Sequence, residues 1–309
     1  MKVKVANIAF SKNNFLVERL LEEFPDAEFN SKGTRINYPE TIEYFSDAEA
    51  IVVGLEKIDD DLLSKLPNLK MIAKFGVGID NIDIDACIKR NILVGWTGGV
   101  NKRSVAEMAL GFMIALSRNL FVTSNQLKEG LWNKNGGTQL SGKTVGIIGF
   151  GNIGKELVKL LKPFGCKIIV NDIIDLEKFN ESFDFQQVSK DYMFREADII
   201  SIHTPLTSET SYLINSSVFE IMKPSSFIIN TARGGIINET DLKEALEKGL
   251  ISGAALDVYN EEPPSDLDLL KQNNFICTPH IGGNSYEAVV AMGMSALDHL
   301  LNFKKQTTK

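Results

Sequence analysis

The sequence predicts an α/β protein of two lobes, each built on a parallel sheet, and three observations support this. The chain has 309 residues, which is long for one ordinary domain and suits two of moderate size. Short apolar, β-branched runs alternate with helical patterns along its length. A glycine-rich turn between a strand and a helix lies near the middle. We therefore expect a second series of strands and helices to begin at that turn.

The first lobe is predicted from the runs that precede the glycine-rich turn. Strands are expected at residues 3–9, 48–53, 69–75 and 92–94, with a helix at 13–24 among them. Strands and helices that alternate in this way form a parallel sheet.

The second lobe is predicted from the runs at and after the turn. Strands are expected at 145–148, 167–170, 198–202, 226–229, 251–256 and 275–278, with a connecting helix at 239–248. Apolar helices expected at 102–117 and 285–303 bracket this series, and we interpret them as the points where the chain crosses between lobes. The first lobe then comprises residues 1–100 and 284–309, and the second comprises 101–283.

The glycine-rich turn is the most informative motif. A strand leads into Gly149, Gly151 and Gly154, a helix follows until Pro163 and Gly165, and a second strand ends at Asp172, eighteen residues past Gly154. In a dinucleotide site these glycines permit the tight turn, the close approach of the pyrophosphate and the packing of helix on strand. An isolated glycine triplet also occurs in ordinary turns, but the full order of elements favours a doubly wound, dinucleotide-binding Rossmann lobe.

The acid at the end of the second strand indicates which dinucleotide is bound. A carboxylate at Asp172 accepts hydrogen bonds from the adenosine ribose and repels a 2′-phosphate. The next residues, 173–175, contain no cation to offset that repulsion. NAD is therefore expected rather than NADP.

Composition excludes several classes of protein. The net charge of −7 gives a nucleic-acid partner no general support. No run approaches the roughly 18 apolar residues of a membrane span, and the first residues do not resemble a signal peptide. We expect a cytoplasmic protein with no nucleic-acid or membrane partner. The three cysteines have no pairing pattern, and no cluster has metal-ligand spacing, so neither disulfides nor a metal is expected.

Three polar residues follow predicted strands of the second lobe: Arg233, Glu262 and His280. Because parallel sheets bind ligands at the carboxyl ends of their strands, all three can converge beside a bound cofactor. Taken singly, Arg233 fits a surface ion pair, His280 a turn histidine and Glu262 a solvated loop. Their joint placement after a dinucleotide motif favours a catalytic site.

The whole chain resembles the D-isomer-specific 2-hydroxyacid dehydrogenases, most closely the D-3-phosphoglycerate dehydrogenase branch. The matching motifs are KFGVGIDNID at 74–83, NKRSVAEMALG at 101–111, GLWNK at 130–134, GFGNIG at 149–154, HTPLT at 203–207, NTARGG at 230–235, ALDVYNEEP at 255–263 and TPHIGG at 278–283. The resemblance implies a flavodoxin-like α/β substrate domain for the first lobe, a Rossmann NAD domain for the second, and a homodimer through the NAD domains.

The resemblance also implies site residues. Arg233, Glu262 and His280 are expected to form the catalytic triad, and Asp257 is expected to hold the nicotinamide carboxamide. The cofactor-binding set is expected to be Gly149, Gly151, Asn152, Ile153, Gly154, Asp172, His203, Thr204, Pro205, Thr231, Ala232, Arg233, Asp257, His280, Gly282 and Gly283. In this set His203, like His299 elsewhere, is expected to be structural rather than catalytic. The substrate-binding set is expected to be Lys74, Gly76, Val77, Gly78, Asn101, Arg103, Arg233 and His280.

The roles suit these residue types. Oxidation of a 2-hydroxy acid removes a hydroxyl proton and a hydride from one carbon, so a base must face the oxygen while the nicotinamide faces the hydrogen. Histidine changes charge near neutral pH and suits that base at position 280. Glu262 against its other ring nitrogen would fix the tautomer, and the planar fork of Arg233 suits a carboxylate. Backbone N–H groups near Val77 and Gly78 are expected to take the remaining carboxylate oxygen, as in the family.

The substrate's tail remains open from the sequence. Phosphoglycerate needs cations, and Lys74 and Arg103 are candidates, although both residues also suit solvated element ends. The residues Trp96-Thr97-Gly98-Gly99-Val100 depart from the Thr-Pro-Gly pattern common in the family, which puts the pocket shape in doubt. We expect 3-phosphoglycerate first and hydroxypyruvate or glyoxylate next, and no carboxyl-terminal regulatory domain. The alternative to an enzyme is a binding protein that senses NAD(H), similar to the dehydrogenase-related corepressors.

Overall fold

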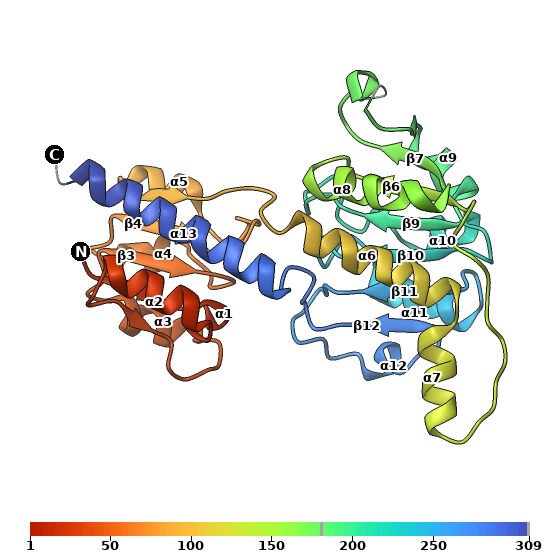
Figure 1. Ribbon diagram of the computed structural model, residues 1–309, viewed down its shortest axis with the longest axis horizontal. Coiled ribbons are helices and arrows are strands. Elements are labelled where there is room, and N and C mark those ends of the chain that lie inside the picture. Colours follow the sequence, from red (N-terminus) through yellow and green to blue (C-terminus); the bar gives the residue numbers. More distant parts are fainter. Residues whose placement is uncertain (180–181, 308–309) are drawn as a thin grey trace. The chain divides into compact units, whose positions relative to one another are not determined.

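The structure, a computed structural model, describes residues 1–179 and 182–307 and divides into two compact units (Figure 1). Unit 1 comprises Met1–Asn101 and Gly283–Lys309, and unit 2 comprises Lys102–Gly282. These bounds differ from the expected ones by one residue at each crossing. Each unit contains a parallel sheet with helices on both faces, as the sequence predicted for an α/β protein.

Unit 1 is built on a five-stranded parallel sheet of order β2-β1-β3-β4-β5, the flavodoxin-like order. Its strands are β1 Val3–Val5, β2 Glu28–Phe29, β3 Ala50–Val53, β4 Met71–Lys74 and β5 Leu93–Gly95. Its helices are α1 Ile8–Ser11, α2 Asn14–Glu23, α3 Tyr38–Phe45, α4 Asp60–Ser64, α5 Ile84–Lys89 and α13 Tyr286–Thr307.

The two faces of this sheet follow the alternation of each strand. Val3, Val5, Val52 and Ala73 belong to one apolar cluster, which also contains residues of α2 and α13. Ile51, Val53 and Ile72 belong to the other cluster, with residues of α3, α4 and α5. Helix α13, from the far end of the sequence, therefore completes unit 1.

Unit 2 is built on a seven-stranded parallel sheet of order β12-β11-β10-β9-β6-β7-β8, which extends the Rossmann order by one strand. The strands are β6 Thr144–Ile148, β7 Lys167–Asn171, β8 Gln186–Gln187, β9 Ile199–Ile202, β10 Phe227–Asn230, β11 Gly253–Leu256 and β12 Phe275–Cys277. The helices are α6 Lys102–Ser117, α7 Leu120–Lys128, α8 Asn152–Leu161, α9 Lys190–Glu196, α10 Ser216–Ile221, α11 Glu239–Glu247 and α12 Leu267–Leu270, with short 3-10 turns η1 Lys162–Phe164 and η2 Glu177–Phe179.

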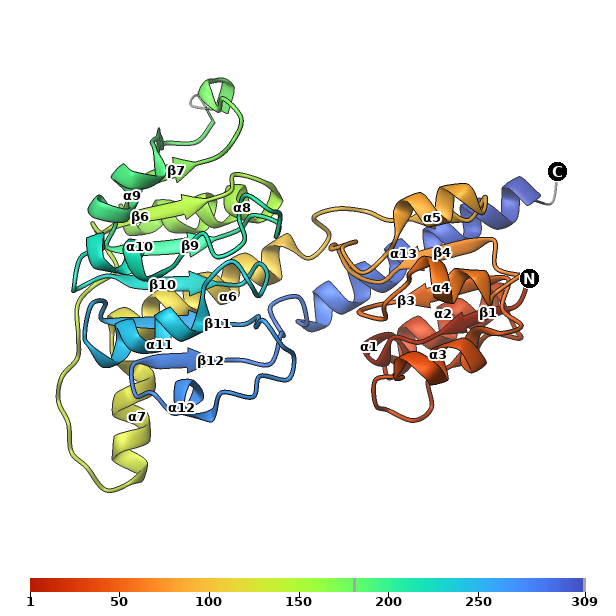
Figure 2. The same cartoon turned by 180° about the vertical axis from the view of Figure 1, so that it is seen from behind.

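Helices cover both faces of the second sheet. One apolar cluster joins α6 and α8 to Val145, Ile147 and Val170, and α6 lies in front of the sheet in Figure 1. The other cluster joins α9, α10 and α11 to the opposite face, which is the face seen in Figure 2. Because all the strands are parallel, the carboxyl ends of β6, β10, β11 and β12 lie at one edge of this layer.

Several expected elements need correction. The strand expected at 3–9 ends at Val5, because the Asn7 side chain accepts the Phe10 N–H and starts α1. The strand expected at 251–256 begins at Gly253. Helices α3, α4, α5, α7, α9, α10 and α12 were not predicted. Most are short, and their amphipathic pattern extends over too few turns to be distinguished from loops.

No single helix among the described residues has the length and apolarity to cross a membrane. One bent pair, Lys102–Ser117 with Leu120–Lys128, passes such a test by length and composition alone.

Candidate active site

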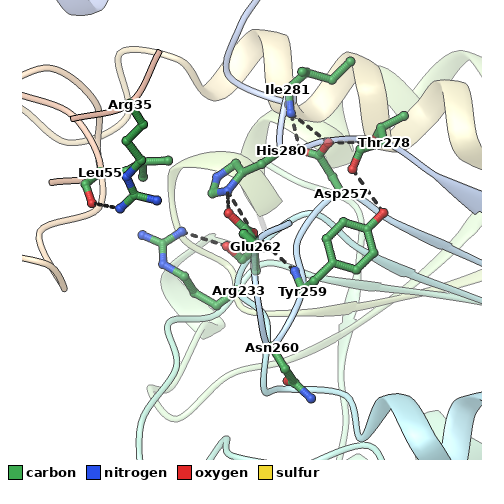
Figure 3. Close-up of polar contacts among 12 residues, drawn as sticks. Arg35, Leu55, Arg233, Asp257, Tyr259, Asn260, Glu262, Thr278, His280 and Ile281 are labelled. Atoms are coloured by element: carbon green, nitrogen blue, oxygen red, sulfur yellow. Dashed lines mark hydrogen bonds and ion pairs between the residues drawn. The ribbon is translucent and has the colours of Figure 1, made fainter. Parts of the chain in front are cut away.

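The three predicted catalytic residues follow three neighbouring strands of unit 2. Arg233 comes after β10, Glu262 after β11 and His280 after β12, and these strands are adjacent in the sheet. Figure 3 shows their side chains gathered at this edge. The structure therefore brings together an imidazole, a carboxylate and a guanidinium from segments far apart in the sequence.

His280 is held against Glu262 at one ring nitrogen. Its Nδ1 lies 3.0 Å from Glu262 Oε1 and 2.8 Å from Oε2. Its Nε2 has no hydrogen-bond partner in the described residues, and 33% of the side chain is exposed. The pair therefore fixes the orientation of the ring and leaves Nε2 available to a ligand.

Asp257 supports the turn that carries His280. The backbone of His280 has φ +53°, a left-handed conformation that few side chains adopt. The buried Asp257 carboxylate accepts hydrogen bonds from Thr278 Oγ1 at 2.6 Å, Ile281 N at 2.9 Å and Gly282 N at 2.7 Å. These bonds enclose His280 on both sides. From the sequence, Asp257 was expected only to contact the nicotinamide. Its support of the turn around His280 was not predicted.

Tyr259 ties together the segments that carry Glu262 and His280. Its hydroxyl donates to the carbonyl oxygens of Leu256 and Thr278, each at 3.1 Å, and its backbone N–H donates to Glu262 Oε1 at 3.3 Å. Burial raises the pKa of this phenol well above its ordinary value, so the hydroxyl stays protonated and remains a donor. The sequence did not single out Tyr259, because a tyrosine beside a strand end has no distinctive pattern.

Arg233 lies on a loop shaped by Asn230. The buried Asn230 side chain accepts the Ala232 N–H at 2.9 Å and donates to the Arg233 carbonyl at 2.8 Å. Arg233 Nη1 donates to the Ala232 carbonyl at 2.7 Å. Gly234 is packed so closely that a Cβ there would lie 1.8 Å from the Tyr259 carbonyl oxygen. The loop that carries Arg233, which we call the arginine loop, therefore packs directly against the loop that carries Glu262.

The glycine-rich turn has the shape that a dinucleotide requires. Gly149 has φ +95°, and a Cβ there would lie 2.5 Å from the His203 carbonyl oxygen. A Cβ on Gly151 would meet nothing within 4 Å, so the space over it is open. Helix α8 starts at Asn152 without a side-chain cap, and its first N–H groups, including those of Ile153 and Gly154, face that space. These residues fit a pyrophosphate.

Asp172 lies at the carboxyl end of β7, beside this turn. Its Oδ2 accepts the Phe150 N–H at 2.7 Å, and its Oδ1 lies 3.2 Å from Ile174 N. Each carboxylate oxygen has a further lone pair, so a ribose hydroxyl can be bound as well.

The remaining expected cofactor contacts lie at the same edge. Thr204 and Pro205 follow β9, and Thr231 follows β10 with a buried hydroxyl that has no partner in the described residues. The Nδ1 atom of His203 is buried and has no hydrogen-bond partner among the described residues. Its Nε2 atom lies 2.9 Å from Ser201 Oγ. Burial lowers the pKa of this imidazole to about 3, so it is neutral, as suits a structural histidine.

The expected substrate residues divide between the two units. Gly76, Val77 and Gly78 form the loop after β4 in unit 1, and Asn101 lies buried beside Gly283 in that unit. Lys74 is also buried there, and its ammonium donates to the Gly54 carbonyl and to Asn81 Oδ1. Arg103 lies on α6 in unit 2 and pairs with Glu107 at 2.6 Å and Glu156 at 3.0 Å.

Unit 1 also contains residues that sequence reasoning missed at the carboxyl ends of its strands. The Asn81 amide donates to the carbonyls of Gly54 and Glu56, and Glu56 accepts the Gly54 N–H at 2.6 Å. The guanidinium of Arg35 donates to the Leu55 carbonyl, a contact drawn in Figure 3. These groups brace the loops after β3 and β4. Asn81 lies inside the motif at 74–83, which could have drawn attention to it, whereas no motif contains Arg35 or Glu56.

A doubly wound sheet with this turn, and with a paired histidine, a glutamate and an arginine at the same edge, defines the class of NAD-dependent dehydrogenases. The chain belongs to the D-isomer specific 2-hydroxyacid dehydrogenase family, because residues 110–282 match the NAD-binding domain of that family. NAD is the cofactor of that domain.

Individual relatives agree with this assignment. A D-3-phosphoglycerate dehydrogenase of Methanocaldococcus jannaschii is 39% identical over 279 residues, which cover 89% of this chain and 53% of the relative. The chain thus spans about half the length of that protein. A hydroxypyruvate reductase of Thermotoga maritima is 39% identical over 267 residues, which cover 84% of this chain and 86% of the relative.

A solved structure shares the whole fold. The D-lactate dehydrogenase of Aquifex aeolicus, complexed with NAD and lactic acid, superposes with a TM-score of 0.84 at 27% identity and covers 99% of this chain and 96% of its own.

Proposed function

We propose that this chain is an NAD-dependent oxidoreductase that interconverts a D-2-hydroxy acid and its 2-keto acid, with His280 as acid and base. The observation that carries the proposal is the contact of His280 Nδ1 with the Glu262 carboxylate at 2.8 Å, which leaves Nε2 available at the same edge of the sheet as the glycine-rich turn. A dinucleotide bound at that turn extends along the carboxyl ends of the strands toward these residues.

The proposed roles follow from the chemistry of each group. In reduction, Nε2 of protonated His280 delivers a proton to the oxygen of the 2-keto group, and in oxidation the neutral ring removes the hydroxyl proton. Glu262 stabilises the positive charge that the ring carries in the first case. Arg233 binds the carboxylate and polarises the keto oxygen. When bound, NAD supplies the carrier of the hydride.

We infer that the tail of the substrate is small and carries no phosphate, as in hydroxypyruvate or glyoxylate. The ammonium of Lys74, which the sequence offered as a phosphate contact, is buried and donates to Gly54 and Asn81. Turning it outward would leave the half-buried Asn81 Oδ1 without its donor and the buried Gly54 carbonyl with only the Asn81 amide at 3.2 Å, which costs of the order of 1 kcal/mol. Lys74 therefore supports the loop after β4.

Phosphohydroxypyruvate, the reduction substrate that corresponds to 3-phosphoglycerate, is the second candidate. The 39% identity to a D-3-phosphoglycerate dehydrogenase favours it. Arg103 also favours it, because ion pairs between exposed groups such as Arg103 and Glu107 are weak and can be exchanged for a phosphate.

The test is a side-by-side assay of NADH oxidation with hydroxypyruvate, glyoxylate, pyruvate and phosphohydroxypyruvate. We expect the highest kcat/KM for hydroxypyruvate or glyoxylate. A preference for phosphohydroxypyruvate would replace the first candidate by the second. Absence of NADH oxidation with all four acids would contradict the proposed function.

We also propose a homodimer formed through unit 2. Helix α7 has no buried residue, and Leu120, Phe121 and Leu127 on it are 51%, 42% and 55% exposed. Three large apolar side chains on one short, uncovered helix are typical of a protein–protein contact.

A further inference from the structure

The loop after β4 offers three consecutive backbone donors. The N–H groups of Gly76, Val77 and Gly78 donate to no protein acceptor in the parts of the chain that the structure describes. The loop is only partly buried, and Gly76 has φ +124°, which only glycine adopts readily. Consecutive free N–H groups in such a turn form a common binding site for an anion.

Trp96, the first residue of the segment 96–100 that departs from the family pattern, contacts this loop from the end of the neighbouring strand. It follows β5, which pairs with β4 in unit 1. Its indole Nε1 donates to the Val77 carbonyl oxygen at 2.7 Å, and 42% of the residue is exposed. An exposed tryptophan with its only polar atom directed at a loop carbonyl is held in one orientation by that bond.

The Val77 carbonyl and the Gly78 N–H belong to the same planar peptide group, so they point in opposite directions and turn together. A bond that fixes the carbonyl therefore also fixes the direction of the N–H. Gly78 has no Cβ to restrict this group, so without the bond the peptide can rotate. Donation to the carbonyl also polarises the peptide and makes its N–H a stronger donor.

We propose that Trp96 is a positioning residue that orients the Val77–Gly78 peptide for binding the substrate carboxylate. This inference rests on the proposed function, because it needs a carboxylate at the loop. Trp96 itself touches neither the reacting carbon nor its proton. Its effect is therefore on the affinity for 2-keto acids, through a group that every such acid shares, and it does not depend on the tail.

The neighbouring residue provides a matched control. Thr97 Oγ1 lies 2.9 Å from Nε2 of His299 on α13, and this contact does not involve the loop after β4. Trp96→Phe and Thr97→Val each remove one hydrogen bond of similar length from the same exposed segment. Only the first change affects the Val77 carbonyl.

The experiment compares the best-reduced 2-keto acid of the assay with its methyl ester. The ester keeps the keto group and the tail but lacks the negative charge. We expect Trp96→Phe to raise the KM for the acid about three- to tenfold, as the loss of one net hydrogen bond predicts. The KM for the ester and for NADH should stay within about twofold, and kcat should fall less than KM rises. The preference for acid over ester, measured as the ratio of kcat/KM, should therefore fall, and Thr97→Val should leave it unchanged.

Each outcome is decisive. An unchanged preference in Trp96→Phe would overturn the inference and reduce Trp96 to a packing residue. A fall of equal size in Thr97→Val would also overturn it, because it would reflect general loosening of the segment. A wild-type protein that reduces acid and ester equally would instead contradict carboxylate recognition in the proposed function. If Trp96→Phe has a lowered Tm, Trp96→Met provides the same comparison, because methionine also lacks a donor.

Discussion

At the scale of single residues, the site depends on one histidine in an unfavourable backbone conformation. A residue other than glycine at φ +53° costs of the order of 1–3 kcal/mol, and such a cost persists only where the surroundings fix the conformation. Asp257 does so with its bonds to Thr278, Ile281 and Gly282. The position of the imidazole is thus set before any ligand binds.

The first residue-scale prediction concerns His280. The His280→Asn variant keeps a polar side chain but cannot deliver or remove the proton, so kcat should fall about 10²- to 10⁴-fold. Binding of NADH, followed by its fluorescence, should be unaffected because the glycine-rich turn is intact. His299→Asn in unit 1 is the control and should retain activity. Activity in His280→Asn within tenfold of the wild type would remove His280 as the acid and base.

The second residue-scale prediction concerns pH and His203. Because its folded pKa is lowered to about 3, the ring binds a proton in the unfolded chain below about pH 6.5, while the native protein does not until about pH 3. Stability is therefore lost as pH falls through this window. At pH 5 the loss is about 2 kcal/mol relative to neutral pH. His203→Gln should remove this part of the pH dependence in urea unfolding. An identical slope in both proteins would show that the ring is protonated in the native state.

The sequence could predict which side chains gather at this edge of the sheet, because strand ends and motif order fix which residues reach it. Arg233, Glu262 and His280 were identified in this way. It could not predict that Lys74 turns inward to Gly54 and Asn81, because a lysine at a strand end has the same pattern whether it faces a ligand or a loop.

At the scale of elements, the loops of the site are fitted together by glycines. Gly234 brings the arginine loop against the backbone of Tyr259, whose N–H in turn donates to Glu262. This contact links the segment after β10 to the segment after β11 without any long side chain. The separation of Arg233 and Glu262 is therefore set by backbone packing.

We predict that Gly234→Ala separates these loops. Its Cβ would lie 1.8 Å from the Tyr259 carbonyl oxygen, so the backbone must move. Such overpacking typically costs about 1–3 kcal/mol, and displacement of the arginine should lower kcat/KM at least about 100-fold. Gly111→Ala is the matched control, because a Cβ there meets nothing within 4 Å inside α6. The control should be stabilised by about 0.5–1 kcal/mol. Equal Tm and activity for the two variants would contradict this account.

The longest helices were the easiest elements to predict from the sequence. Helices α6 and α13 were found because their apolar pattern repeats over several turns, and the glycine-rich turn was found from the spacing of its glycines between a strand and a helix. The end of β1 was placed wrongly because Ala6, Ile8 and Ala9 resemble a continuation of the strand, whereas the side chain of Asn7 between them caps α1.

At the scale of the whole molecule, each unit has its own sheet and its own apolar core on both faces. The sequence could predict this division because the two series of strands are separated by long apolar helices. It could not predict the exposed face of α7, since the exposure of a helix depends on what packs against it.

We predict that Phe121→Asp converts the proposed dimer to a monomer. A carboxylate in an apolar contact must lose its hydration without gaining a partner, and that cost exceeds what a modest interface supplies. Sedimentation velocity measures the outcome. Ile88→Asp changes another large apolar residue, 67% exposed, on unit 1 and should leave the proposed dimer intact. A Phe121→Asp protein that sediments as the wild type does would exclude α7 from the interface.

The return of α13 to unit 1 has a consequence for the order of events at the ribosome. The strands of unit 1 are made first, but the helix that covers Val3, Val5 and Val52 leaves the exit tunnel only after about 180 further residues. At synthesis rates of about 5–20 residues per second, the part of this face that α2 does not cover stays exposed for roughly 10–40 s. The inserted unit has its own core and can fold during that interval, so the first unit to be translated is the last to mature.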